Sequence, residues 1–297
     1  MRRSQGLASL KSGLRRVTPP SVLALRRRLQ SPVAREEPIP PEWEYVPEGW
    51  ARRDDPHVEG WDAASVLAAY RAKLPDFRKL LEGTDPIAVA TSAAFPVGPP
   101  RIEHQNQVLA FAYALALASR TTDSITVLDW GGGLGFFYFL SRALLPRDVG
   151  IEYHCKEMPD ICSYGRDALP EIRFHDDDSC LDHTYDLVLA SSSLQYSEDW
   201  VHVLQGLAGA AHRYLFLTRV PVAFSHRSFV VLQRTYGHAF KTEYLSWVFN
   251  RGELLERAAR CGLGLVREFL LGDKPVVVGA PEQDETRGFL FQPAPAG

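Results

Sequence analysis

Residues 126–137 of this 297-residue chain read Thr-Val-Leu-Asp-Trp-Gly-Gly-Gly-Leu-Gly-Phe-Phe. The first five residues have the composition of a buried strand, and the glycines that follow open a helix that is expected to begin near Leu134. Glycine lets the backbone come close to a ligand, and the free N–H groups of a helix N-terminus attract polar or anionic groups. The stretch therefore predicts a ligand site where a strand turns into a helix.

The spacing of the glycines narrows the kind of ligand. A dinucleotide fingerprint, G-x-G-x-x-G, would need its third glycine where Phe136 stands. A phosphate-binding P-loop would need a lysine followed by Ser or Thr, and this loop has neither. What remains is Asp129 at the end of a strand, followed by Gly-Gly-Gly-Leu-Gly.

Composition indicates an ordinary soluble, globular protein, with 45% hydrophobic and 23% charged residues. The cysteines form no C-x-x-C pair, so we expect reduced thiols and no metal site; they are Cys155, Cys162, Cys180 and Cys261. The apolar runs are too short to span a bilayer.

Residues 1–35 hold nine of the 33 Lys and Arg residues and no Asp or Glu. Leucines recur there at helical spacing with arginines on another face, which is typical of a basic amphipathic surface helix. No apolar run follows Arg2 and Arg3, so a cleaved secretory signal is not expected. A transit peptide, a basic extension docked on the main domain and contact with anionic lipid all stay open. We expect a cytoplasmic protein, with peripheral contact at the inner face of the membrane as an alternative.

The remainder divides into three parts. Residues 36–60 are rich in proline and tryptophan and predict an extended connector, 61–285 form the main domain, and 286–297 are a C-terminal tail. In the main domain, strands and helices alternate as in a doubly wound α/β sheet. A pair of helices is expected over about 62–81, and a strongly apolar helix over 104–120. The expected strands are Ile125–Trp130, Gly150–Cys155, Ile172–Phe174, Tyr185–Ala190, Tyr214–Arg219, Leu263–Leu271 and Pro275–Gly279.

Only Gly272, Asp273 and Lys274 separate the last two of these seven strands, which predicts a tight hairpin and hence an antiparallel terminal strand. A nicotinamide-binding fold more often ends with parallel strands. The predicted fold class is thus a Rossmann-like, seven-stranded α/β sheet with a reversed last strand and an N-terminal helical or extended extension.

The motif at 127–135 resembles motif I of class I S-adenosylmethionine-dependent methyltransferases. With 44–50, 190–196 and 249–254 it is similar to a family of bacterial methyltransferases associated with polysaccharide or lipopolysaccharide biosynthesis, over roughly Trp43 to Ala280. This resemblance implies S-adenosylmethionine as the cofactor. It places the methionine part of the cofactor beside Asp129, Trp130, Gly131, Gly132, Gly133 and Gly135.

Further cofactor contacts are expected at the ends of the next strands. Glu157 lies about 20 residues beyond the glycine loop, a register that suits a ribose-binding acid, and Met158 beside it could cover adenine. Asp176 or Asp177 is expected near the adenine amino group, although a solvated turn fits them too. Ser191 and Ser192 are small residues suited to the place where methyl donor and acceptor meet. A serine nucleophile would need a G-x-S-x-G elbow, which is absent.

Methyl transfer depends chiefly on positioning, with a general base needed for a poorly ionised acceptor. The candidates for that base are His104, Tyr196, His226 and His238, and the polar segment 219–247 could form an acceptor lid. The resulting hypothesis is O-methylation of a small molecule or a glycan precursor. Alternatives are a catalytically silent methyltransferase-like module and a nicotinamide-dependent oxidoreductase. A nucleic-acid partner is not expected, because the main domain is acidic and the basic residues lie in a separable segment.

Overall fold

A computed structural model describes residues 40–62, 64–88, 101–236 and 240–294. The chain divides into residues 1–40 and residues 41–297, and the sheet and its helices belong to the second unit. The predicted basic segment 1–35 and the candidate base His238 lie outside the described residues.

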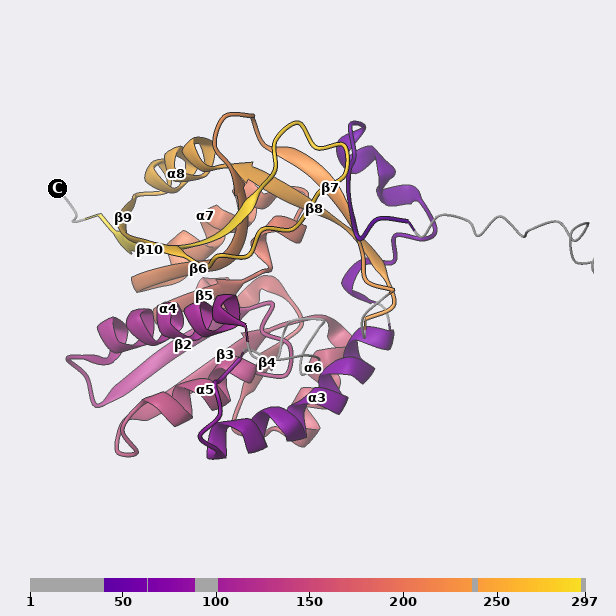
Figure 1. Cartoon of the computed structure of the whole chain (residues 1–297). Coiled ribbons are helices and arrows are strands. Elements are labelled where there is room, and N and C mark those ends of the chain that lie inside the picture. Colours follow the sequence, from indigo (N-terminus) through magenta and orange to yellow (C-terminus); the bar gives the residue numbers. More distant parts are fainter. Residues whose placement is uncertain (1–39, 63, 89–100, 237–239, 295–297) are drawn as a thin grey trace, which may run out of the picture. The chain divides into compact units, whose positions relative to one another are not determined.

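The core of this unit is a twisted sheet in which five strands run parallel (Figure 1). In spatial order these are β4 (Arg173–His175), β3 (Gly150–Lys156), β2 (Ser124–Trp130), β5 (Tyr185–Ser191) and β6 (Ala211–Ala223). Next to β6 lies β10 (Glu285–Pro293), which is antiparallel to β6 and to the outer strand β9 (Leu263–Leu270). The predicted fold class, a doubly wound α/β sheet with a reversed terminal strand, is confirmed.

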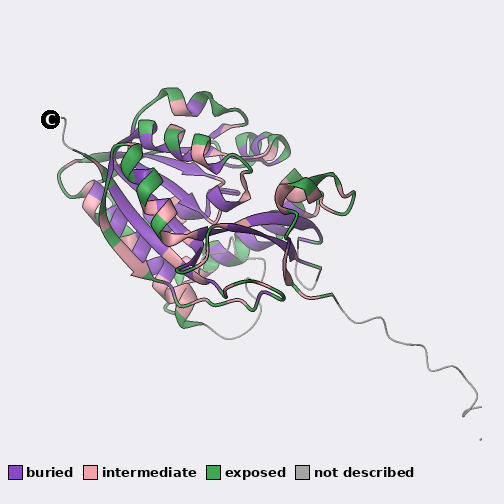
Figure 2. Ribbon diagram, turned by 90° about the horizontal axis from the view of Figure 1, so that it is seen from above, coloured by how far each residue is buried: buried purple, intermediate pink, exposed green. Residues whose placement is uncertain are grey.

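The sheet is buried on both faces. Successive side chains of each strand point to opposite faces, and apolar residues on both faces pack against two layers of helices. In β2, Ile125 and Val127 point into one core, and Leu128 and Trp130 point into the other. Figure 2 shows the strands buried and the outer surfaces of the helices exposed.

One core packs under α3 (Ala64–Glu82), α4 (Ile102–Ser119), α5 (Phe136–Leu144) and α6 (Pro159–Ala168). The other lies under α7 (Trp200–Ala210) and α8 (Arg251–Arg260). Short 3-10 helices complete the unit: η2 (Gly49–Asp54), η3 (Gly60–Asp62), η4 (Asp178–Asp182) and η5 (Leu194–Tyr196). Among the described residues, no helix is both long and apolar enough to cross a membrane. The four cysteines are free thiols.

The prediction of a terminal strand at Pro275–Gly279 was wrong. Residues 275–279 form no strand, and Val276 and Val278 are 77% and 51% exposed. The last strand is instead β10, which lies in the expected C-terminal tail and buries Phe289 and Phe291. Strand pairing depends on which segment can bury its side chains against neighbours, and of the valines at 276–278 only Val277 is buried, in a small core with Phe229, Val231 and Val248.

An additional strand pair extends the sheet beyond β6. β7 (Phe229–Arg234) and β8 (Glu243–Asn250) form an antiparallel hairpin, and β8 meets the end of β6 at Val222 and Ala223. The expected polar lid is therefore mostly a buried hairpin. β1 (Trp43–Tyr45) pairs with β7, so this part of the expected connector is an edge strand, the place in a sheet that tolerates flanking prolines.

Candidate functional site

The glycine loop leaves the carboxyl end of β2 at the point where the strand order reverses, between β3 and β5. Ligands of doubly wound sheets bind in the crevice at such a point. Gly131, Gly133 and Gly135 all have left-handed backbone, with φ of 75°, 62° and 70°. A Cβ at Gly131 would lie 2.6 Å from Ser193 Cβ, and one at Gly132 would lie 2.3 Å from Asp129 Oδ2. The loop therefore accepts only glycine at these two positions.

Asp129 supports this loop from below. Its side chain is fully buried, and Oδ2 accepts a hydrogen bond of 2.7 Å from Tyr153 Oη. Within the described segments, Oδ1 has no hydrogen-bond partner. Burial raises the pKa of Asp129 to about 7. The residue is absent from the lining of both cavities at this end of the sheet, and its side chain lies between Tyr153 of β3 and the backbone of Gly132.

Glu157, just after β3, joins the loop to the neighbouring strand. Its Oε1 accepts a hydrogen bond of 3.0 Å from Gly133 N, and its Oε2 accepts one of 2.7 Å from Met158 N. Burial raises the pKa of Glu157, and the two backbone N–H groups oppose that rise by stabilising the carboxylate.

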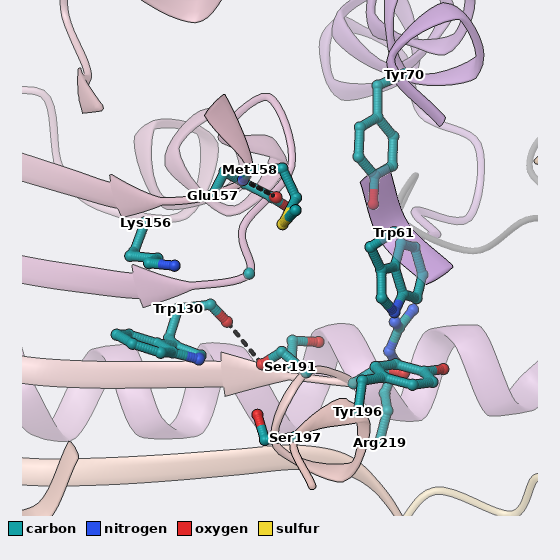
Figure 3. A pocket seen from close by; sticks show the side chains of 13 residues that line it. Trp61, Tyr70, Trp130, Lys156, Glu157, Met158, Ser191, Tyr196, Ser197 and Arg219 are labelled. Atoms are coloured by element: carbon teal, nitrogen blue, oxygen red, sulfur yellow. Dashed lines mark hydrogen bonds between the residues drawn. The ribbon is translucent and has the colours of Figure 1, made fainter. Parts of the chain in front are cut away.

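A cavity of about 200 Å³ opens at the ends of β2, β3, β5 and β6 (Figure 3). Trp130 and Lys156 lie on one side of it, and Trp61, Tyr70, Tyr196 and Arg219 lie on the other. The rest of its lining is Gly131, Glu157, Met158, Ser191, Ser192, Ser193 and Ser197. Ser191 Oγ is buried and has no hydrogen-bond partner among residues 40–62, 64–88, 101–236 and 240–294, so the cavity holds a polar group that a ligand can engage.

A larger cavity of about 510 Å³ adjoins the first. The two share Trp61, Ser192, Tyr196 and Arg219. The larger one continues between the start of α4, the β7–β8 hairpin and the connection from β9 to β10, where it is lined by residues that include His104, Gln233, Lys274 and Asp284. The pair thus provides two connected compartments that meet at these four side chains.

Aromatic rings border the junction of the compartments. Trp61 stacks on Tyr244 at 4.6 Å between ring centroids and meets Tyr196 edge-on at 4.9 Å. Tyr70 of α3 lies within reach of the glycine loop, since a Cβ at Gly133 would be 3.2 Å from its ring. These contacts attach the first helices of the unit to the carboxyl end of the sheet.

Two residues other than glycine adopt left-handed backbone beside the cavities: Ser192, just after β5, with φ of 54°, and Arg219, within β6, with φ of 55°. Ser192 N donates to Thr218 O at 2.9 Å. Gln195 Nε2 donates to Ser192 Oγ at 2.9 Å and to Arg219 O at 3.3 Å. Such strain persists only where neighbouring contacts hold it, and it concentrates at functional sites.

The structure brings many of the expected site residues together. Those that line the smaller cavity are Trp130, Gly131, Glu157, Met158, Ser191 and Ser192, and Tyr196 lines both cavities. His104 lines the larger cavity. Gly132, Gly133 and Gly135 shape the loop without being part of the lining.

Other expected residues lie elsewhere. Asp176 forms an ion pair of 3.0 Å with Arg166, and Asp177 caps η4 by accepting a hydrogen bond from Ser179 N. Both aspartates are exposed and absent from the lining of the two cavities. His226 is also absent from it, and its backbone N donates to Glu282.

Sequence reasoning missed Trp61, Tyr70 and Asp284 as site residues. Trp61 and Tyr70 come from segments that precede the glycine loop, and only the tertiary packing of α3 brings them to it. Asp284 stood in a stretch expected to close the main domain, and no local pattern distinguishes it from a surface aspartate. An aromatic residue just before an amphipathic helix was the one available signal for Trp61.

Comparisons with known proteins give fold likenesses only. No family model and no curated protein matches the chain. Among solved structures, the chain is similar to magnesium protoporphyrin IX methyltransferase from Synechocystis PCC 6803, at 14% identity and a TM-score of 0.43, covering 77% of this chain and 98% of that one. It is also similar to 1,6-didemethyltoxoflavin-N1-methyltransferase from Burkholderia thailandensis (15% identity, TM-score 0.41, covering 78% of this chain and 88% of that one). A further likeness is to an S-adenosylmethionine-dependent methyltransferase from Clostridium acetobutylicum (11%, TM-score 0.44, 76% and 99%).

Proposed function

We propose that the protein is an S-adenosylmethionine-dependent methyltransferase that acts on a small-molecule acceptor. The observation that carries the proposal is the pairing of Glu157 with the glycine loop at the reversal of strand order. The buried carboxylate of Glu157 lines the cavity beside a loop of glycines, whose backbone a ligand can approach closely. This arrangement suits a nucleoside with an attached amino acid.

The side chains of the smaller cavity fit this cofactor. Each Glu157 oxygen keeps a lone pair beyond its backbone hydrogen bond and can accept a ribose hydroxyl. Met158 offers an apolar surface to a base, and Ser191 Oγ supplies an unused polar group. When bound, the cofactor would supply a methyl group on a sulfonium. Gly131, Glu157, Met158, Ser191 and Ser192 would hold it, with Trp130 at the edge.

The acceptor compartment would be the larger cavity. His104 and Tyr196 are the candidate bases that line it. Burial lowers the pKa of His104, which keeps the imidazole neutral and able to accept a proton. Burial raises the pKa of Tyr196, which keeps its hydroxyl protonated as a hydrogen-bond donor. His104 is therefore the proton acceptor that we favour for O-methylation of a hydroxyl.

Calorimetry with S-adenosylhomocysteine tests the proposal. We expect saturable binding at one site per chain, and single-turnover assays with an acceptor panel that includes glycan precursors would then separate an enzyme from a silent module. A folded protein that binds neither S-adenosylmethionine nor S-adenosylhomocysteine would overturn the assignment. Fluorescence enhancement of NADH on addition of the protein would favour the oxidoreductase alternative.

Lipid contact by residues 1–35 remains a separate proposal, supported by the basic amphipathic pattern of that segment. Co-sedimentation with anionic vesicles should be strong for the full chain and weak for a chain that begins at residue 36. Equal pelleting of the two proteins would remove the membrane role, and with it the proposed location at the inner face of a membrane.

A further inference from the structure

Asp284 lies in the wall of the larger cavity, where its buried carboxylate lacks hydrogen-bond donors from the described residues. It precedes β10, is 3% exposed and belongs to the cavity lining. Neither of its oxygens accepts a hydrogen bond from another of the described residues. An ionised carboxylate without partners is costly to bury, so the position needs an explanation beyond folding.

A second acceptor faces the same compartment. Gln195 is 3% exposed, and its Oε1 has no hydrogen-bond partner in the part of the chain that the structure describes. The orientation of this amide is determined by its nitrogen, which donates to Ser192 Oγ and to the carbonyl oxygen of Arg219. The amide oxygen of Gln195 is therefore left as an unused acceptor at the cavity wall.

The lining has three arginine or lysine side chains: Arg219 lies at the junction with the smaller cavity, and the other two, Arg101 and Lys274, have anionic partners. Arg101 pairs with Glu103 at 3.2 Å and with Asp273 at 3.3 Å. Lys274 pairs with Glu285 at 2.9 Å. Asp273 and Glu285 also lie near enough to Asp284 to oppose its ionisation. A ligand with hydrogen-bond donors would satisfy Asp284, whereas an anionic group beside it would be repelled.

We infer that the larger cavity recognises a small molecule through hydroxyl or amino groups on that molecule, with Asp284 as the principal acceptor and Gln195 Oε1 as a second one. The inference rests on the proposed function in one respect: this molecule would be the methyl acceptor. Asp284 binds it, and the methyl donor lies in the adjoining cavity.

The test uses three size-matched probes: cis-1,2-cyclohexanediol, cyclohexylamine and cyclohexanecarboxylate. Saturation-transfer NMR on the full chain with S-adenosylhomocysteine should detect binding of the diol and the amine and not of the carboxylate. Asp284→Asn should weaken the binding of cyclohexylamine roughly tenfold, because a hydrogen bond to a charged carboxylate is replaced by one to a neutral amide. Asp284→Leu should abolish both signals. The matched control is Asp54→Asn, whose side chain is 91% exposed, and it should leave both signals unchanged.

Calorimetry on the same proteins separates the two proposals. Retained affinity of Asp284→Leu for S-adenosylhomocysteine would show that the variant is folded and its donor site intact. If the wild type binds the diol but not S-adenosylhomocysteine, the methyltransferase proposal fails. The inference that Asp284 binds a hydroxyl or amino group would still hold. The inference is overturned if the carboxylate probe binds as well as the diol, if the diol and amine still bind Asp284→Leu, or if none of the probes binds.

Discussion

The Gly133 N–H donates a hydrogen bond of 3.0 Å to Glu157 Oε1, which ties the loop after β2 to the residue that follows β3. The other oxygen of the same carboxylate accepts from Met158 N. Backbone groups thus hold Glu157 in place before any ligand arrives, so little conformational freedom remains to be lost on binding.

Replacing Glu157 by glutamine should weaken S-adenosylhomocysteine binding roughly tenfold to a hundredfold. Hydrogen bonds to a charged group contribute about 1.5–3 kcal/mol, and one face of the amide would present N–H groups where the backbone already donates. Calorimetry measures the change. Glu256→Gln on α8, where the side chain is 62% exposed, is the control and should bind normally. Undiminished affinity in folded Glu157→Gln would exclude Glu157 from the cofactor site.

Alanine at Gly131 should abolish cofactor binding and lower the free energy of unfolding by about 1–2 kcal/mol. The new Cβ would lie 2.6 Å from Ser193 Cβ, on a backbone with φ of 75°. The matched control is Gly209→Ala in α7, where no described atom apart from the helix backbone and the adjacent residues lies within 4 Å of the added Cβ. That change should stabilise the helix by about 0.5–1 kcal/mol. Equal melting temperatures for the two variants would contradict the conclusion that the loop cannot accommodate a side chain at Gly131.

Asp284→Asn should stabilise the protein in a pH-dependent way. Burial raises the pKa of Asp284 to about 7 from an ordinary 3.8. Between these values the folded carboxyl holds a proton that the unfolded chain has released, so the free energy of unfolding falls as pH rises. The variant should exceed the wild type by up to about 4 kcal/mol near pH 8, with the gain shrinking toward about pH 4.

Urea denaturation of both proteins across this range measures the difference. Burial also raises the pKa of Asp129 to about 7, but Asp129 titrates in both proteins and cancels in the comparison. A stability difference that does not change with pH would show that Asp284 has no raised pKa in the folded state.

Phe291→Ala should cost about 3–5 kcal/mol, because the ring is 1% exposed in the core under α7 and α8. The neighbouring Gln292 points to solvent, so Gln292→Ala should change stability very little. Thermal and urea unfolding measure both. Similar costs for the two variants would mean that β10 does not pack between β6 and β9.

The sequence predicted the parallel part of the fold well because its strands are apolar and its glycine loop has a specific spacing. In β2, Ile125 and Val127 face one helix layer and Leu128 faces the other. A strand with apolar residues on both faces is typical of a buried strand in a parallel sheet. The positions of Glu157, Ser191 and Ser192 followed from the same geometry, since parallel strands end at one edge of a sheet.

The rest depended on tertiary packing. Val276, Val277 and Val278 have high β-propensity but find only a single bridge, between Val278 and Glu44. The residues of β10 include Gly288 and Pro293, which weakened any strand prediction, and they pair because β6 and β9 both offer an edge. Likewise, Asp176 and Asp177 follow a strand as expected, but local partners, Arg166 and Ser179, engage their carboxylates.

The place of β10 also bears on how the chain is made. Because β10 lies between β6 and β9, those two strands have no direct pairing that could form first. During synthesis, the whole parallel core and β9 leave the ribosome before the segment that joins them. Until then β6 and β9 each present an unpaired edge, open to strands of other nascent chains. Completion of the sheet, and of the wall of the larger cavity to which Asp284 and Thr286 belong, must therefore await the emergence of β10 from the ribosome.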